Sequence, residues 1–185
     1  MASIKRRGGL IRIELRPEER MVLAGFAREV AQLVGGGADD GPEHGADAGA
    51  DPLAELVGLH EAPDYPSDDP ALQRLFPDAY DDPAAAQEFR RLTSGELRRT
   101  KATALADLAA AIEAHGGRVE VEPEQADMWL AAVNDIRLVL ATRLGVDDDA
   151  GTWRTQMPPD DPRLPLVAAY DWLSMLQELL VDALT

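Results

Sequence analysis

The sequence predicts a mainly α protein, a helical bundle that carries one small antiparallel β-ribbon. Ala, Leu and Val supply most of an apolar content of 45%, whereas aromatic residues make up only 5%, and this mixture favours helices over sheets. Apolar residues recur at helical spacing in several segments, and some of these segments begin at Pro and end at Gly. Only two short segments alternate apolar and charged residues as strands do.

The ribbon is predicted from these two alternating segments, at about residues 10–15 and 118–122. The charges on their polar faces favour an antiparallel register, because a parallel register with the same offset would oppose like charges. The expected cross-strand pairs are Arg12 with Glu120 and Glu14 with Arg118. The two strands lie far apart in the chain, so the ribbon would join its beginning to its middle.

Two helices are predicted in the first two thirds of the chain. The first begins at Pro17 and ends at the Gly35-Gly36-Gly37 run, with a proposed apolar stripe of Met21, Val22, Phe26, Val30 and Leu33. The second begins at Pro83, is capped by Asp82 and ends at Gly116-Gly117. Thr93-Ser94-Gly95 interrupts its pattern, and Ser94 is placed to cap a separate helix starting near Glu96.

Two further helices are predicted after the second strand. One runs from Pro123 to Gly145, with one side formed by Trp129, Val133, Ile136, Leu140 and Leu144. The last runs from about Leu164 to Ala183 and has two apolar stripes. Two stripes imply burial on two sides, either inside the monomer or against a partner, so a homodimer through this helix is one interpretation.

Acidic residues are concentrated in one part of the chain. The net charge is −16, and residues 38–82 hold 13 acidic residues and one basic residue. We therefore expect a single domain, residues 1–185, with a flexible acidic insertion at about 35–51 and a Pro/Asp-rich segment at 60–82. Four apolar residues of the second segment are expected to dock on the core: Leu72, Leu75, Phe76 and Tyr80.

Composition excludes several classes of function. The absence of cysteine excludes disulfide, thiolate and zinc-thiolate chemistry, and an isoelectric point of about 4.4 argues against direct DNA binding and anionic membranes. The three histidines lack metal-ligand spacing, and no catalytic, cofactor or metal site is expected. Without a signal peptide or an 18-residue apolar run, a cytoplasmic protein with no membrane span is expected.

Two groups of residues are candidates for partner binding. The basic cluster is either paired with the acidic stretch or solvated, or it binds an anionic partner such as nucleic acid or an acidic protein. The polar pair in the middle of an apolar helix predicts a buried network with Arg137, Arg143 or backbone groups, a catalytic site being the alternative. The candidate residues are Arg90, Arg91, Arg98, Arg99 and Lys101 in the cluster, and Asn134, Asp135 and Arg137 around the pair.

Four blocks of sequence resemble a known family. The runs are LFPDAYDDPAAAQEFRRLT, ELRRTKATALADL, WLAAVNDIRLVLATRLG and YDWLSMLQELL. They resemble the actinobacterial AosR-like oxidative-stress regulator family, formerly a domain of unknown function, over nearly the whole chain. These blocks are helical signatures rather than catalytic motifs.

The resemblance implies a non-enzymatic cytoplasmic regulator that contacts the transcription machinery through a sigma factor or RNA polymerase. An adaptor linked to Clp proteolysis is the alternative that it implies, and an enzyme using carboxylates and a divalent metal is the third hypothesis. Regulation in the family is tied to thiol oxidation, which this chain without cysteine cannot perform. Oxidation of Met21 or Met157 is the chemical alternative.

Overall fold

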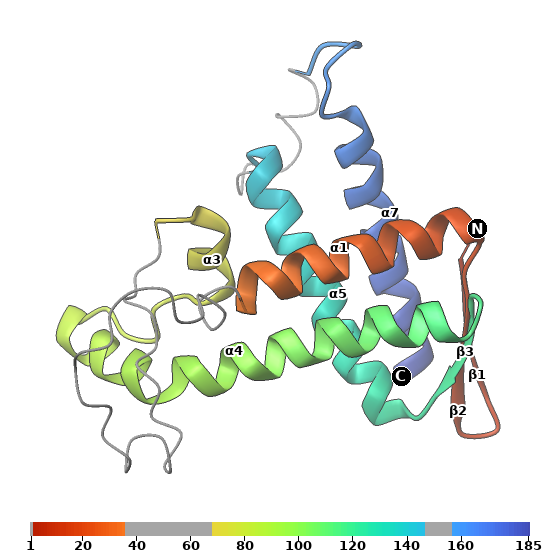
Figure 1. Ribbon diagram of the computed structural model, residues 1–185, viewed down its shortest axis with the longest axis horizontal. Helices are drawn as coiled ribbons and strands as arrows, with labels where there is room; N and C mark the ends of the chain where they lie inside the picture. Colours follow the sequence, from red (N-terminus) through yellow and green to blue (C-terminus); the bar gives the residue numbers. More distant parts are fainter. Residues whose placement is uncertain (1, 36–67, 147–156) are drawn as a thin grey trace, which may run out of the picture.

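The chain is mainly α, as its sequence predicts. A computed structural model describes residues 2–35, 68–146 and 157–185, and within these ranges a small sheet lies at one end of the molecule, with the long helices to one side of it (Figure 1). The described strands are β1 (Ser3–Arg7), β2 (Leu10–Glu14) and β3 (Arg118–Val121). The described helices are α1 (Pro17–Gly35), α3 (Pro70–Leu75), α4 (Pro83–Ala114), α5 (Pro123–Leu144) and α7 (Leu164–Leu184).

The sheet has three antiparallel strands in the order β1-β2-β3. The predicted ribbon consisted of β2 and β3 and lacked β1. The added strand β1 pairs with β2 through a tight turn at Gly8-Gly9, whose positive φ angles of 60° and 94° suit glycine. Its sequence, SIKRR, holds a single apolar residue, Ile4, which is buried. A strand with one apolar residue has no detectable alternation, so only its pairing with β2 reveals it.

The predicted register between β2 and β3 is confirmed. Arg12 lies opposite Glu120 and donates to it from Nε at 2.7 Å, and Arg118 Nε lies 3.0 Å from the Glu14 carboxylate. The inward residues of the same strands, among them Ile11 with no exposed surface, enter the core. The alternation therefore defined the buried face, and the charges defined the register.

Helix α1 buries only part of the predicted stripe: Val30 is buried, and Phe26 and Leu33 are half-buried against the core. Met21 and Val22 are 72% and 40% exposed, while the buried apolar residues are Leu23, Ala24, Ala27, Val30 and Val34. Small residues on this face let α1 lie close along α4, its main neighbour. Because α1 has apolar residues on most of its circumference, its periodicity could not select between the two faces.

Helix α4 is continuous from Pro83 to Ala114, so the predicted interruption at Thr93-Ser94-Gly95 is wrong. Thr93 Oγ1 donates to the Phe89 carbonyl at 2.8 Å, and Ser94 lies on the buried side. A hydroxyl that bonds back to the preceding turn satisfies its donor inside a helix and does not end it. Asp82 caps the start of α4 as predicted, accepting from the Ala85 amide at 2.9 Å.

The described part of the Pro/Asp-rich segment, residues 68–82, packs on the helices through α3. Leu72, Leu75 and Phe76 are buried as expected, but Tyr80 is 52% exposed and instead stacks edge-on against Phe89. The remainder of this segment and the acidic insertion after Gly35 lie outside the described residues.

Helix α5 occupies the centre of the arrangement. It packs against α1, α3, α4, α7 and β2, and all five residues of its predicted apolar side are buried. One hydrophobic cluster includes residues from every described helix and strand. The central helix therefore holds together the elements that form the candidate site below.

Helix α7 is, among the described helices, the one that is long and apolar enough to cross a membrane by length and composition. The sequence predicted no such span, and a single helix of this kind is weak evidence for one. Leu173, Leu176 and Leu180 of α7 are buried against the rest of the molecule. Its second stripe (Trp172, Met175 and Leu179) is half-buried on the same core.

Candidate protein-binding groove

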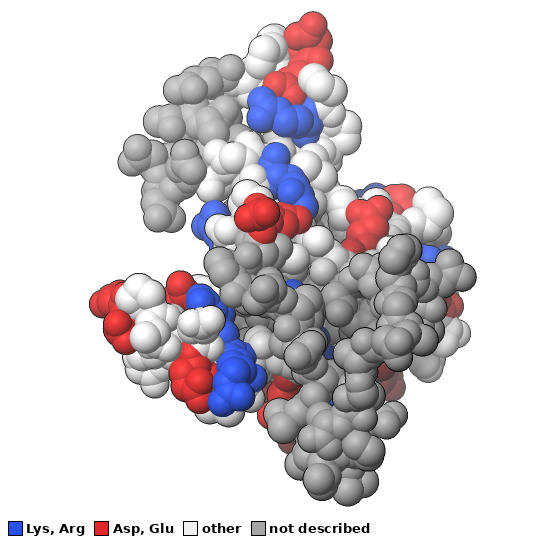
Figure 2. Space-filling view, turned by 60° about the vertical axis from the view of Figure 1, so that its left-hand side comes forward, with Lys and Arg blue, Asp and Glu red and all other residues white. Residues whose placement is uncertain are grey.

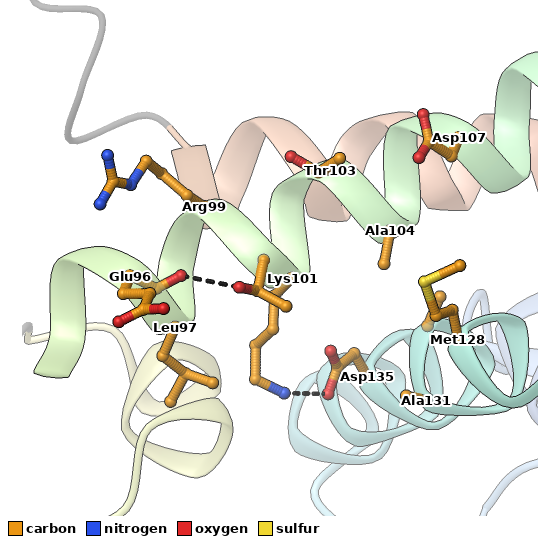
Figure 3. A pocket seen from close by; sticks show the side chains of 12 residues that line it. Glu96, Leu97, Arg99, Lys101, Thr103, Ala104, Asp107, Met128, Ala131 and Asp135 are labelled. Atoms are coloured by element: carbon orange, nitrogen blue, oxygen red, sulfur yellow. Dashed lines mark hydrogen bonds and ion pairs between the residues drawn. The ribbon is translucent and has the colours of Figure 1, made fainter. Parts of the chain in front are cut away.

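A pocket of about 660 Å³ lies between α4 and α5, and we call it the α4–α5 groove (Figure 3). Met128 extends from α5 toward Ala104 on α4, and Leu97 lies farther along α4. The residues that line the groove are Glu96, Leu97, Arg99, Thr100, Lys101, Thr103, Ala104, Asp107, Met128, Ala131, Ala132 and Asp135. Three of the eight candidate residues, Arg99, Lys101 and Asp135, are thus brought together here.

An ion pair joins the two walls of the groove. Lys101 Nζ donates to Asp135 Oδ1 at 2.6 Å, and the Asp135 side chain is 5% exposed. Burial raises the pKa of Asp135, and the hydrogen bond and charge of Lys101 offset only part of that rise. The predicted buried network therefore exists, but its cation is Lys101 from α4 rather than Arg137 or Arg143.

The other two candidates on α5 face α7 and not the groove. Arg137 Nε donates to Ser174 Oγ at 3.0 Å, its guanidinium also bonds Gln177, and it lies over the Tyr170 ring. Asn134 Oδ1 accepts from Gln177 Nε2 at 3.4 Å. Asn134 and Arg137 therefore connect α5 to α7, whereas Asp135 points from another face of α5 toward α4.

Arg90 and Arg98, two other candidates on α4, lie outside the groove lining. Arg90 forms an ion pair with Asp78, and Arg98 lies over the Phe76 ring, so both contact the segment after α3. Burial lowers the pKa of Arg98. These contacts agree with the expectation that part of the cluster is paired with the acidic stretch.

The two remaining arginines of the cluster are exposed. Arg91 pairs with Glu88 on its own helix at 2.9 Å. Arg99 makes no hydrogen bond or ion pair within the described ranges, and it borders the groove. Figure 2, in which the α3 side of the molecule comes forward, shows basic side chains interspersed with acidic ones. This mixture is a poor surface for a polyanion.

Exposed apolar side chains are the feature that the sequence analysis missed. Leu97 is 44% exposed and Met128 is 51% exposed. Farther toward the start of α4, Phe89 and Leu92 are 42% and 63% exposed. Leu97 and Met128 line the same groove, and exposed apolar residues that lie together are typical of a protein-binding surface.

The described residues provide no group of three or more His, Asp or Glu side chains that could hold a metal ion. His115 is the C-cap of α4, and its Nδ1 lies 2.9 Å from the Ala111 carbonyl oxygen. The groove is lined by one buried ion pair, two threonines, three further charged side chains and five apolar residues.

The fold and the groove define a class of protein: a mainly helical protein with a small sheet and an exposed groove between two core helices. The model of a domain of unknown function, DUF2017, matches residues 1–184. The chain therefore belongs to the DUF2017 family.

Relatives of known name support the predicted resemblance. The chain is 30% identical to "Oxidative stress regulator AosR" of Mycobacterium bovis over 190 residues, covering 95% of this chain and 83% of the relative. The protein of that name from Mycobacterium tuberculosis matches with the same identity and coverage. No solved structure matches the chain.

Proposed function

We propose that this protein is a non-enzymatic cytoplasmic regulator of the oxidative stress response that binds a sigma factor or RNA polymerase through the α4–α5 groove. The names of its relatives support the regulatory role. The observation that carries the choice of site is the pair of exposed apolar residues, Leu97 and Met128, beside the groove. The cores of protein interfaces are apolar and enriched in methionine.

Charge favours a partner with basic residues around an apolar contact. Lys101 and Asp135 in the groove lining neutralise one another. The remaining charged residues of the lining are Glu96, Asp107 and Arg99, which leaves a net negative charge. The whole chain carries −16. Proteins that bind nucleic acid have basic surfaces, so an acidic regulator is electrostatically complementary to the transcription machinery. An amphipathic helix with basic flanks would complement the apolar residues and the net negative charge of this lining.

The test is direct binding between the full chain and purified RNA polymerase or individual sigma factors of its own organism. Leu97→Asp places a charge at the apolar wall and is expected to weaken binding at least tenfold. Val181→Asp on α7 is the matched control, because Val181 is 42% exposed and Leu97 is 44% exposed. Circular dichroism establishes that both variants are folded.

Equal binding by Leu97→Asp and the wild type would exclude the groove. Arg91→Glu then tests the alternative site on the outer face of α4, where Arg91 is 66% exposed. Binding to Clp components in place of the polymerase and sigma factors would favour the adaptor hypothesis.

A further inference from the structure

The methionines of this chain differ in their exposure. The chain has five methionines and no cysteine, so all of its sulfur atoms are methionine thioethers. Among the described residues, Met21 is 72% exposed and Met128 is 51% exposed, while Met157 and Met175 are half-buried. An exposed thioether is accessible to hydrogen peroxide, which converts methionine to its sulfoxide.

Met128 is the exposed methionine that lines the α4–α5 groove. Its side chain extends toward Ala104 of α4 (Figure 3), and Ala131 and Ala132 of α5 line the same groove. Alanine side chains offer no hydrogen-bond donor. Met21 lies on α1 and does not line the groove.

Of the four side chains that line the groove and carry donors, Arg99 and Thr103 point away from Met128 (Figure 3), and the other two are already used. Lys101 Nζ donates to Asp135, and Thr100 Oγ1 donates to the Glu96 carbonyl at 3.0 Å. A sulfoxide oxygen at Met128 is solvated by water while the groove is open. It loses that water when the apolar face of the partner covers it, and an unsatisfied buried acceptor weakens binding.

We propose that Met128 is an oxidation site whose sulfoxide prevents a partner from docking in the α4–α5 groove. The proposal rests on the groove being the partner site, as proposed above. In the reaction, the thioether sulfur attacks one oxygen of hydrogen peroxide and the O–O bond breaks. The sulfur gains one oxygen and is oxidised by two electrons, and the peroxide is reduced to water.

The test compares partner binding before and after treatment of the full chain with hydrogen peroxide, with peptide mass mapping of every methionine. Oxidised wild type is expected to bind RNA polymerase or its sigma factor at least tenfold more weakly, which corresponds to about 1.4 kcal/mol. Met128→Leu keeps a similar apolar volume and is expected to retain binding after oxidation. Met21→Leu is the matched control and is expected to lose binding as the wild type does.

Treatment with methionine sulfoxide reductases is expected to restore binding to the oxidised wild type. Unchanged binding with Met128 fully oxidised would overturn this inference and leave the groove proposal intact. Loss of binding by oxidised Met128→Leu would also overturn it, because another residue would then be responsible. Absence of binding by the reduced protein would overturn both proposals.

Discussion

Gly117 illustrates how one residue fixes the junction between helix and sheet. It has φ of +91°, its carbonyl accepts from the Leu15 amide at 2.7 Å, and it is buried between α4 and β3. A Cβ at this position would lie 2.6 Å from both the Leu15 carbonyl oxygen and Arg20 Cδ. The sequence identified this glycine only as a helix end, but the close contacts show that no residue with a Cβ fits this position without a shift of its neighbours.

Gly117→Ala is therefore expected to lower the free energy of unfolding by about 1–3 kcal/mol, from backbone strain alone. Gly95→Ala is the matched control, because Gly95 lies inside α4 and a Cβ added there would meet no atom within 4 Å. Alanine favours a helix interior, so this variant is expected to gain about 0.5–1 kcal/mol. Urea unfolding of both variants measures the difference, and equal changes would contradict the argument.

The ion pair in the groove leads to a second prediction at the residue scale. Lys101→Met leaves the Asp135 carboxylate buried without its cation and is expected to cost about 3–5 kcal/mol at neutral pH. Removing both charges, with Lys101→Met and Asp135→Asn together, is expected to cost much less. A double-mutant cycle of unfolding free energies tests this, and additive losses would contradict it.

The same pair has a defined pH dependence. The pKa of Asp135 is raised above its ordinary value of 3.8 by burial, so the folded state binds this proton more tightly than the unfolded state. Its contribution to stability therefore falls as pH rises from about that ordinary value through the folded pKa. Lys101→Met removes the groups that lower this pKa, so its stability deficit is expected to shrink in acid.

At the scale of elements, the start of α1 depends on one buried carboxylate. Glu19 is 6% exposed and accepts from the Arg16 amide at 2.8 Å and from the Arg16 guanidinium at 2.9 Å. This arrangement is the acidic half of a capping box. Burial alone would raise the pKa of Glu19, but these hydrogen bonds outweigh it and hold the pKa below its ordinary value.

Glu19→Ala is expected to cost about 1 kcal/mol, because it removes a helix cap. The stabilisation by ionised Glu19 is present above its ordinary pKa of 4.5 and is lost as pH falls through the lowered folded value. Glu19→Gln keeps an acceptor for the Arg16 amide and is expected to show a weaker loss of stability in acid. Unfolding curves between pH 7 and pH 3 check this; identical pH profiles would refute it.

The stability of the whole molecule depends on α5, which contacts four other helices and the sheet. Ile136 has no exposed surface and is among the largest fully buried side chains. Ile136→Ala is expected to cost about 2–5 kcal/mol, because the surrounding elements cannot all close on the cavity. Leu138→Ala, at a half-buried position of the same helix, is expected to cost clearly less in thermal unfolding.

The sequence by itself determined the features that depend on local patterns and charges. It predicted a mainly α chain, helices starting at Pro17, Pro83 and Pro123, and the register that pairs Arg12 with Glu120. These features could be read because proline, capping residues and cross-strand charges act over a few atoms. The family could be recognised for a similar reason, since its helical blocks are contiguous in the chain.

Only the tertiary structure decided which faces are buried and which residues meet. It selected Leu23 rather than Met21 as a core residue of α1, made α4 continuous through Gly95, and added β1 to the sheet. It also directed the neighbouring side chains of Asn134 and Asp135 to different helices, Asn134 to Gln177 of α7 and Asp135 to Lys101 of α4. The physical reason is that burial and pairing depend on packing between distant segments, and several faces of one helix can satisfy the same local pattern.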